Sequence, residues 1–199
     1  MSRIAPLVPP YAPEIREQFD RIMRGAPPLV LFRVMAGNAR AWEKFRAGSL
    51  LDGGPLGLRE REIVIDRTCA LTRCEYEWGV HVTTFAAAAH LTEDQIRATV
   101  LEAAGAPCWS AAEQTLIAAV DALHARASLT DAEFAALSAH YEDAKILEII
   151  LLCGFYRMVS YLANGLDLPL EANAARFPTA QSPPSSLRKQ GPIATSGHD

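Results

Sequence analysis

The chain has 199 residues, of which 50% are hydrophobic and 21% are charged, and its formal net charge is −4. This composition is typical of a globular protein of one domain, and the small acidic excess argues against a polyanion-binding surface, so we expect no nucleic-acid partner. The four cysteines show no secretory spacing and the proline-rich N-terminus does not resemble a signal peptide, so we expect a cytoplasmic protein with free thiols.

Helical periodicity runs through most of the chain, after a proline-punctuated arm over residues 1–13. Capping-box patterns, in which a threonine or serine is followed three residues later by glutamine or glutamate, mark helix starts at Thr92, Ser110 and Thr130. Eight helices are expected, over residues 13–24, 29–47, 57–71, 73–90, 92–105, 110–127, 130–140 and 141–164.

Two of these ranges contain an ambiguous stretch. Gly37-Asn38 lies inside the range 29–47 and is expected to kink that helix. The run from Ile63 to Ile65 is compatible with a strand, but its Arg/Glu-rich flanks and the continuing apolar spacing of three and four favour a helix. The predicted fold class is therefore all-α, with about seven or eight helices.

The helix expected over residues 141–164 is the most apolar. Its segment from Ile146 to Val159 leaves almost no polar face, so we expect it to lie in the core with partners on all sides. The same run is interrupted by Glu148 and Arg157 and is too short to span a bilayer, so we expect no membrane association.

The C-terminal end of the chain differs in composition from the rest. From Phe177 onward it is polar, contains Pro183-Pro184-Ser185-Ser186 and shows no periodicity. Such a segment cannot bury enough apolar surface to offset its ordering entropy. We therefore expect a single helical domain over residues 1–177 and a disordered tail over residues 178–199.

One predicted helix carries a thiol, a carboxylate and an imidazole on its apolar side. At about 100° per residue, Cys74, Glu77 and His81 fall within one narrow arc, which Trp78 and Phe85 share. Buried polar groups are costly unless they are paired or used. This segment is therefore the first place to look for chemistry.

The preceding helix repeats the pattern, since Glu62 stands in an apolar stripe with Leu58, Ile65 and Cys69. Glu62 could instead be a solvated charge, as we expect for its neighbours Arg59, Glu60 and Arg61. We favour a functional carboxylate because of the stripe.

His81 could be a core histidine bonded to a carbonyl, but Glu77 one turn earlier and Glu62 on a neighbouring helix favour a functional role. Its ordinary pKa near 6.5 suits proton transfer at neutral pH. Glu77 could either orient the imidazole or act directly. Glu77 and His81 have usable metal-ligand spacing, but H-E-x-x-H is absent, so we expect no metal and no cofactor.

Three further side chains are candidates for lining a substrate pocket: Cys74, Trp78 and Tyr156. Each also has a purely structural explanation, as a buried thiol, a core ring or an oligomer contact. Arg67 and Arg73 flank the motif and could attract a carboxylate substrate, although a solvated position is the simpler expectation for both.

With these residues in place, the chain resembles the carboxymuconolactone decarboxylase family, which is related to the AhpD-type alkylhydroperoxidases. The resemblance covers roughly residues 28–171. The stretches that carry it are Leu58–Ile65, the Y-E-W-x-x-H string from Tyr76 to His81, and Gly154–Val159. It implies an all-helical fold, assembly as a homo-oligomer, and a pocket near the motif helix.

The resemblance also implies a choice between two chemistries, because the family includes cofactor-free decarboxylases of aromatic catabolism and disulfide-relay peroxidases. Relay members carry a glutamate, a C-x-x-C pair and a histidine four residues after the second cysteine. Here Glu62, Cys74 and His81 match, but Glu77 stands where the second cysteine should be. A relay needs a resolving thiol within disulfide distance, and Cys69 would point elsewhere on a continuous helix. We expect no intramolecular relay.

The sequence therefore predicts a cofactor-independent decarboxylase-like lyase that acts on a small carboxylated lactone or cyclic acid. His81 would be the acid/base, Glu77 its orienting partner, and Glu62 a second proton-transfer or pocket group. Two alternatives stay open: a peroxidase-like protein that uses Cys74 alone with an external thiol, and a non-catalytic helical module for oligomerisation or ligand binding.

Overall fold

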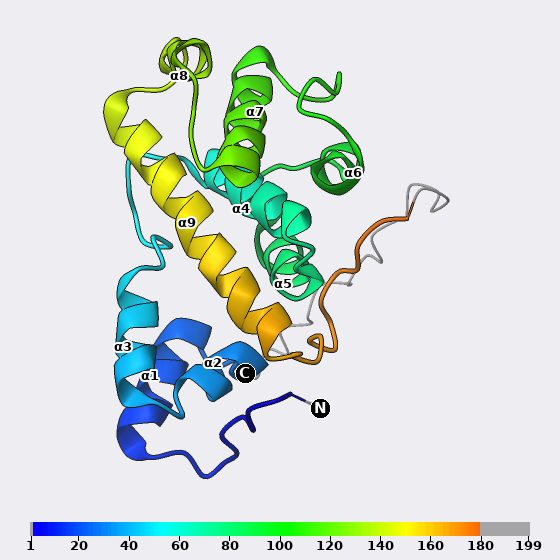
Figure 1. Ribbon diagram of the computed structural model, residues 1–199. Coiled ribbons are helices and arrows are strands. Elements are labelled where there is room, and N and C mark those ends of the chain that lie inside the picture. Colours follow the sequence, from blue (N-terminus) through cyan, green and yellow to red (C-terminus); the bar gives the residue numbers. More distant parts are fainter. Residues whose placement is uncertain (1, 180–199) are drawn as a thin grey trace, which may run out of the picture.

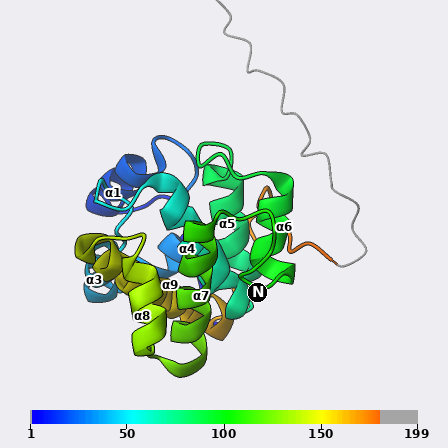
Figure 2. The ribbon, with the colours of Figure 1, turned by 90° about the horizontal axis from the view of Figure 1, so that it is seen from above.

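The computed structural model describes residues 2–179, and within them the chain forms nine α-helices and no strand (Figures 1 and 2). The all-α prediction is confirmed, with one or two more helices than expected. The helices are α1 (Pro13–Met23), α2 (Val30–Met35), α3 (Ala39–Ala47), α4 (Leu58–Leu71), α5 (Glu75–Phe85), α6 (Glu93–Leu101), α7 (Ala111–Arg126), α8 (Asp131–Ser138) and α9 (Asp143–Gly165).

The expected helix over residues 29–47 is in fact two helices, α2 and α3. Asn38 adopts an extended conformation with φ −129°, and its side chain accepts a hydrogen bond from the Ala41 amide at 3.0 Å. Asn38 is therefore the N-cap of α3, so a new helix begins here and α2 does not continue through a bend. The Gly37-Asn38 pair therefore breaks the helix, and the prediction of a kink was wrong.

A tight turn separates α4 from α5. Arg73 adopts the left-handed conformation with φ 55°, and the amides of Arg73 and Cys74 donate to the carbonyls of Ala70 and Cys69 at 3.0 and 2.8 Å. These two bonds form a Schellman motif, which satisfies the last carbonyls of α4. Cys69 and Cys74 therefore do not share a continuous helix, which agrees with the separate helices expected over residues 57–71 and 73–90 but removes the argument that Cys69 points away from Cys74 on one helix.

Helix α4 lies at the centre of the fold and packs against α5, α6, α7 and α9. Every residue from Glu62 to Cys69 is buried, so its polar side chains have no access to a solvated face. Arg67 was expected to be solvated, but its guanidinium bonds both carboxylate oxygens of Asp121 on α7, at 2.6 and 2.9 Å. Arg67 is thus a structural tie between two helices.

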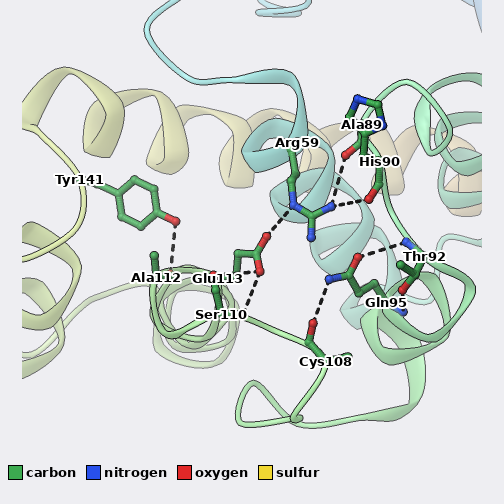
Figure 3. A network of polar contacts seen from close by, with 10 residues as sticks. All are labelled: Arg59, Ala89, His90, Thr92, Gln95, Cys108, Ser110, Ala112, Glu113 and Tyr141. Atoms are coloured by element: carbon green, nitrogen blue, oxygen red, sulfur yellow. Dashed lines mark hydrogen bonds and ion pairs between the residues drawn. The ribbon is translucent and has the colours of Figure 1, made fainter.

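The N-terminal end of α4 is fixed by Arg59 (Figure 3). Its Nε donates to Glu113 Oε1 on α7 at 2.6 Å, and its Nη1 donates to the carbonyls of Ala89 and His90 at 3.3 and 2.6 Å. Glu113 also belongs to the predicted capping box at Ser110, which the structure confirms. One guanidinium therefore joins α4 to α7 and to the turn that follows α5.

Helix α9 crosses the molecule diagonally in Figure 1, and only one of its sides is buried. Ile149, Leu152 and Val159 are inaccessible or nearly so, whereas Leu147 and Tyr161 are 63% and 62% exposed. Within the chain α9 therefore has partners on one side only, and partners on its other sides, expected from a homo-oligomer, stay a prediction. By length and composition α9 could cross a membrane, a property that core helices of soluble proteins share, and 44% of its most apolar window is buried.

The segment after α9 folds back over α5 (orange in Figure 1). The Ala175 amide donates to the Gly79 carbonyl at 3.2 Å, and the ring of Phe177 packs edge-on against Trp78 at 5.2 Å between centroids. Glu171 accepts hydrogen bonds from the Tyr76 hydroxyl and the Val30 amide. Most of the tail expected over residues 178–199 lies outside the described residues.

Replacing Gly79 with alanine should destabilise the protein, because the added Cβ would overlap with the carbonyl oxygen of Ala175. Overpacking of this kind costs about 1–3 kcal/mol. Thermal unfolding followed by circular dichroism measures the loss. In the control variant Gly53→Ala, the new Cβ meets nothing within 4 Å. Equal melting temperatures for the two variants would contradict the close approach.

Candidate active site

The three residues singled out as catalytic lie together in the structure. His81 Nδ1 is 2.7 Å from Glu62 Oε2, and His81 Nε2 is 3.5 Å from Glu77 Oε1. All three are buried, with exposures of 3% for His81, 1% for Glu62 and 7% for Glu77. Glu62 comes from α4, while Glu77 and His81 lie one turn apart on α5. The packing of α4 on α5 therefore places one imidazole between two carboxylates.

The two carboxylates decide the charge of the imidazole. Burial by itself lowers the pKa of His81, but hydrogen bonds to Glu62 and Glu77 and their negative charges raise this pKa to about 10. His81 is therefore an imidazolium at neutral pH. Its Nδ1–H donates to Glu62, and its Nε2–H is directed toward Glu77.

Arg61 supplies a second positive charge. Two of its guanidinium nitrogens lie 2.9 Å from Glu62 Oε1, and the guanidinium carbon lies 5.3 Å from the centre of the Phe85 ring. The side chain is only 12% exposed, so the expectation of a solvated Arg61 was wrong. Arg61 and His81 together balance the charges of Glu62 and Glu77, as a buried cluster requires.

Asp66 is a member of the site that the sequence analysis missed. It is 1% exposed, and neither carboxyl oxygen has a hydrogen-bond partner in the described part of the chain. Burial raises its pKa well above the ordinary value, the charge of Glu62 adds to that, and the charge of His81 opposes it. Burial therefore favours the protonated form of Asp66 beside the charged cluster. In the sequence, the feature that could have indicated Asp66 is its position one helical turn after Glu62.

Glu77 retains an unused hydrogen-bonding site. Its Oε2 atom is buried and has no partner among the described residues, whereas both oxygens of Glu62 are engaged. A buried acceptor without a donor is costly. Of the two carboxylates, Glu77 is therefore the one that can accept a further proton or hydrogen bond without breaking an existing contact.

Of the proposed pocket residues, Tyr156 packs directly against the histidine. Its ring meets the His81 ring edge-on at 5.0 Å between centroids, and Phe85 packs on the same imidazole at 5.2 Å. Trp78 points elsewhere, since its indole nitrogen donates to Thr99 Oγ1 at 3.0 Å. The low-polarity surroundings of His81 are therefore made by Phe85 and Tyr156, without Trp78.

His81 does not line either of two surface hollows formed by residues of the described chain. One of about 440 Å³ lies between α7 and α8, and one of about 220 Å³ is lined by residues that include Arg73, Tyr76 and Asn164. Within residues 2–179 no group of three or more His, Cys, Asp and Glu side chains is arranged to hold a metal ion. What the cluster offers chemically is proton transfer in an enclosed environment of low polarity.

The arrangement of helices is the AhpD-like helical fold. An uncharacterized peroxidase-related protein from Silicibacter sp. TM1040 has 20% identity and a TM-score of 0.73, with coverage of 86% of this chain and 92% of that one. An AhpD-core, peroxidase-related protein from Ralstonia eutropha JMP134 has 19% identity and a TM-score of 0.71, covering 86% and 93%. The debrominase Bmp8 has 18% identity and a TM-score of 0.67, covering 85% and 92%.

Residues 36–122 match the sequence model of the carboxymuconolactone decarboxylase family. The match contains Glu62, Glu77 and His81, so the resemblance noted from the motif is confirmed. No curated protein matches the chain at a significant level. At 20% identity or below, the solved structures establish the common fold.

The charged state of His81 should be visible in the pH dependence of stability. Its pKa is raised from 6.5 in the unfolded chain to about 10 in the fold. The resulting stabilisation is complete below about pH 6.5 and is lost as the pH rises through about 10. The melting temperature should fall over this interval, and less steeply in His81→Gln. Calorimetry at stepped pH measures both; parallel curves would contradict a charged His81.

Burial keeps the two thiols near the motif in the protonated form. Cys69 and Cys74 are both free and fully buried. Burial raises the pKa of Cys74 to about 11 and that of Cys69 well above its ordinary value. Since the thiolate is the reactive form, the thiols should be inert at neutral pH, although the turn between α4 and α5 removes the geometric reason given from the sequence.

We therefore expect no Cys69–Cys74 disulfide after mild treatment of the native protein with hydrogen peroxide at neutral pH. Peptide mapping by mass spectrometry under non-reducing conditions measures the bond. Protein unfolded in urea before the same treatment is the positive control, because both thiols are then exposed. A high yield of the bond in the native protein would revive a disulfide relay.

Proposed function

We propose that the protein is a cofactor-independent, decarboxylase-like lyase that acts on a small carboxylated lactone or cyclic acid. The observation that carries this proposal is the imidazolium of His81 held between Glu62 and Glu77 in a buried, apolar environment. The match of residues 36–122 to the carboxymuconolactone decarboxylase family supports the same reaction class.

The proposed reaction breaks the bond between a ring carbon and its carboxylate. The electron pair of that bond moves onto the ring carbon and a neighbouring carbonyl, which gives an enolate-like anion and carbon dioxide. The carbon then takes a proton from His81 Nε2, while Nδ1–H remains bonded to Glu62. One proton is consumed in each turnover, and its uptake from solvent restores the imidazolium.

The neighbours of His81 have separate roles in this scheme. Arg61 and Glu62 hold the Nδ1 side of the ring in place, so the ring presents Nε2 as its reacting atom. Glu77 stabilises the imidazolium, and its unpaired Oε2 can accept the proton that replaces the one transferred. The rings of Phe85 and Tyr156 exclude water and strengthen these electrostatic interactions.

The two alternatives have less support. A single-cysteine peroxidase needs a thiolate, but Cys74 is fully buried and its pKa is raised to about 11. A non-catalytic module has no need of buried charges, because replacing a buried ion pair with apolar side chains is often neutral or stabilising. The cluster around His81 is therefore better explained by chemistry.

The test is release of carbon dioxide from carboxymuconolactone and from a panel of five- and six-membered cyclic carboxylic acids. His81→Gln should abolish turnover, because it removes the proposed proton donor. Glu77→Gln should lower turnover by about a hundredfold, as expected when a positioned proton-transfer partner is removed. Circular dichroism should show that both variants keep their helical content.

Glu43→Gln is the matched control, because this carboxylate lies on α3 with a side chain that is 67% exposed. It should keep full activity. Failure of every compound in the panel to release carbon dioxide would overturn the proposed function, as would an active His81→Gln variant.

A further inference from the structure

His81 has to become accessible before it can act on a substrate. It is only 3% exposed, so part of its cover has to move. Helices α4, α5 and α9 form most of this cover, and they pack against one another in the core. Phe85, which packs on the imidazole, is only partly buried, and the Arg61 guanidinium carbon lies 5.3 Å from the centre of its ring. Phe85 and Arg61 therefore belong to the side of the cover that faces solvent.

Arg61 is also in contact with the connection between α3 and α4, which is not helical (cyan in Figure 1). This connection, residues 48–57, is here called the entry loop. Arg61 Nη1 on α4 donates to the Leu51 carbonyl at 3.2 Å, and the Leu56 amide donates to Glu148 Oε2 on α9 at 3.2 Å. Both distances are at the long end of the range for N–H···O bonds. The two bonds that join the entry loop to these helices are therefore weak.

The sequence of the entry loop suits a segment that moves. Four of its ten residues are glycines, and every residue from 51 to 55 is exposed. Leu50 has φ 49°, in the left-handed region that a bulky side chain rarely adopts. Residues held in such conformations are concentrated in functional and switching segments. Opening of the entry loop would release this strain, which reduces the free-energy difference between its closed and open positions.

The two adjacent glycines of the entry loop have different surroundings in the closed position. A Cβ added at Gly54 would lie 2.5 Å from Glu148 Oε1, on the carboxylate that accepts the Leu56 amide. A Cβ added at Gly53 would meet nothing within 4 Å. The closed position therefore requires a glycine at 54 and makes no such demand at 53.

We propose that the entry loop is the gate of the active site and that Arg61 is its latch, which opens when a substrate carboxylate replaces the Leu51 carbonyl on Nη1. In the closed form Arg61 holds the entry loop through Nη1 and Glu62 through Nε. In the open form the bond to Glu62 remains. The movement of the entry loop does not depend on the reaction at His81, whereas the choice of a carboxylate rests on the proposed function.

The partners of Arg61 explain why an anion would operate the latch. Hydrogen bonds in which both groups are charged are roughly twice as strong as neutral ones. Of the two partners of the guanidinium, Glu62 is a carboxylate and the Leu51 carbonyl is neutral, so the carbonyl is the partner that an incoming anion displaces. A neutral molecule of the same shape gains no such advantage. Arg61 is thus a specificity-determining residue at the entrance.

The gate can be tested by hydrogen–deuterium exchange of the full chain, followed by mass spectrometry of peptides that cover residues 48–57. Gly54→Ala should speed exchange there by about three- to tenfold, as expected for the loss of one hydrogen bond of the closed form. The added Cβ displaces only the end of the flexible Glu148 side chain, so the fold should stay intact. Gly53→Ala is the matched control and, after correction for intrinsic exchange rates, should match the wild type.

The latch can be tested by adding a small anion in the same experiment. The probe is γ-butyrolactone-γ-carboxylate, and the corresponding γ-carboxamide is its neutral match. The carboxylate should speed exchange of the entry loop in the wild type, and the carboxamide should not. Arg61→Gln should exchange fast without a ligand and should not respond to the carboxylate. Arg16→Gln, on α1 with a side chain that is 74% exposed, is the control and should respond as the wild type does.

Equal exchange in Gly54→Ala and Gly53→Ala, together with a protected entry loop in Arg61→Gln, would overturn the gate. An entry loop that responds equally to the carboxylate and the carboxamide, or that is slowed by the carboxylate, would overturn the role of Arg61 as the latch. Both experiments measure exchange and neither requires turnover. Absence of carbon dioxide release with these exchange responses intact would therefore refute the proposed reaction and support the gate.

Discussion

A buried positive charge on His81 is the constraint on which the centre of this molecule depends. An imidazolium that is 3% exposed persists only if carboxylates accompany it. One carboxylate is a helical turn away on α5, but the other, Glu62, has to come from α4. The packing of α4 against α5 and the charge of the histidine therefore require each other, since separating the helices would leave an unpaired charge in the core.

The same constraint explains why α4 is so polar for a helix buried on all sides. Arg67 is paired with Asp121, and Glu62 is paired with Arg61 and His81, so each of these charges has a partner. Asp66 has no partner among the described residues, and its burial raises its pKa, which favours the neutral form, as is usual for an isolated acid in a core. These side chains stabilise the fold less than leucines of similar volume would. Through the ion pairs of Arg67 with Asp121 and of Glu62 with His81, they tie α4 to α7 and α5 in one relative orientation.

Periodicity and capping patterns were sufficient to predict the fold class and most helices, because each is a local property of the sequence. The convergence of Glu62 and His81 could be predicted because both interrupt an apolar stripe. The burial of Arg61 and Asp66 was not predicted. A helical wheel gives the direction in which a side chain leaves the helix, but it does not show how far the side chain extends or which other elements pack over it. The exposed side of α9 was missed for a related reason. An apolar helix face indicates that other residues should pack against it, but the sequence does not say whether those residues belong to the same chain.

The return of the C-terminal segment over α5 has a consequence for the biosynthesis of the protein. The amide that bonds Gly79 belongs to Ala175, and the carboxylate that bonds Tyr76 belongs to Glu171. Almost a hundred residues separate the partners in each case, so α5 stays uncovered on the ribosome until nearly all of the described chain has emerged. Contacts of such long range slow folding. Completion of this cover therefore waits until residue 175 has emerged, and a nascent chain that stalls before residue 171 would present the Tyr76–Gly79 part of α5 to chaperones.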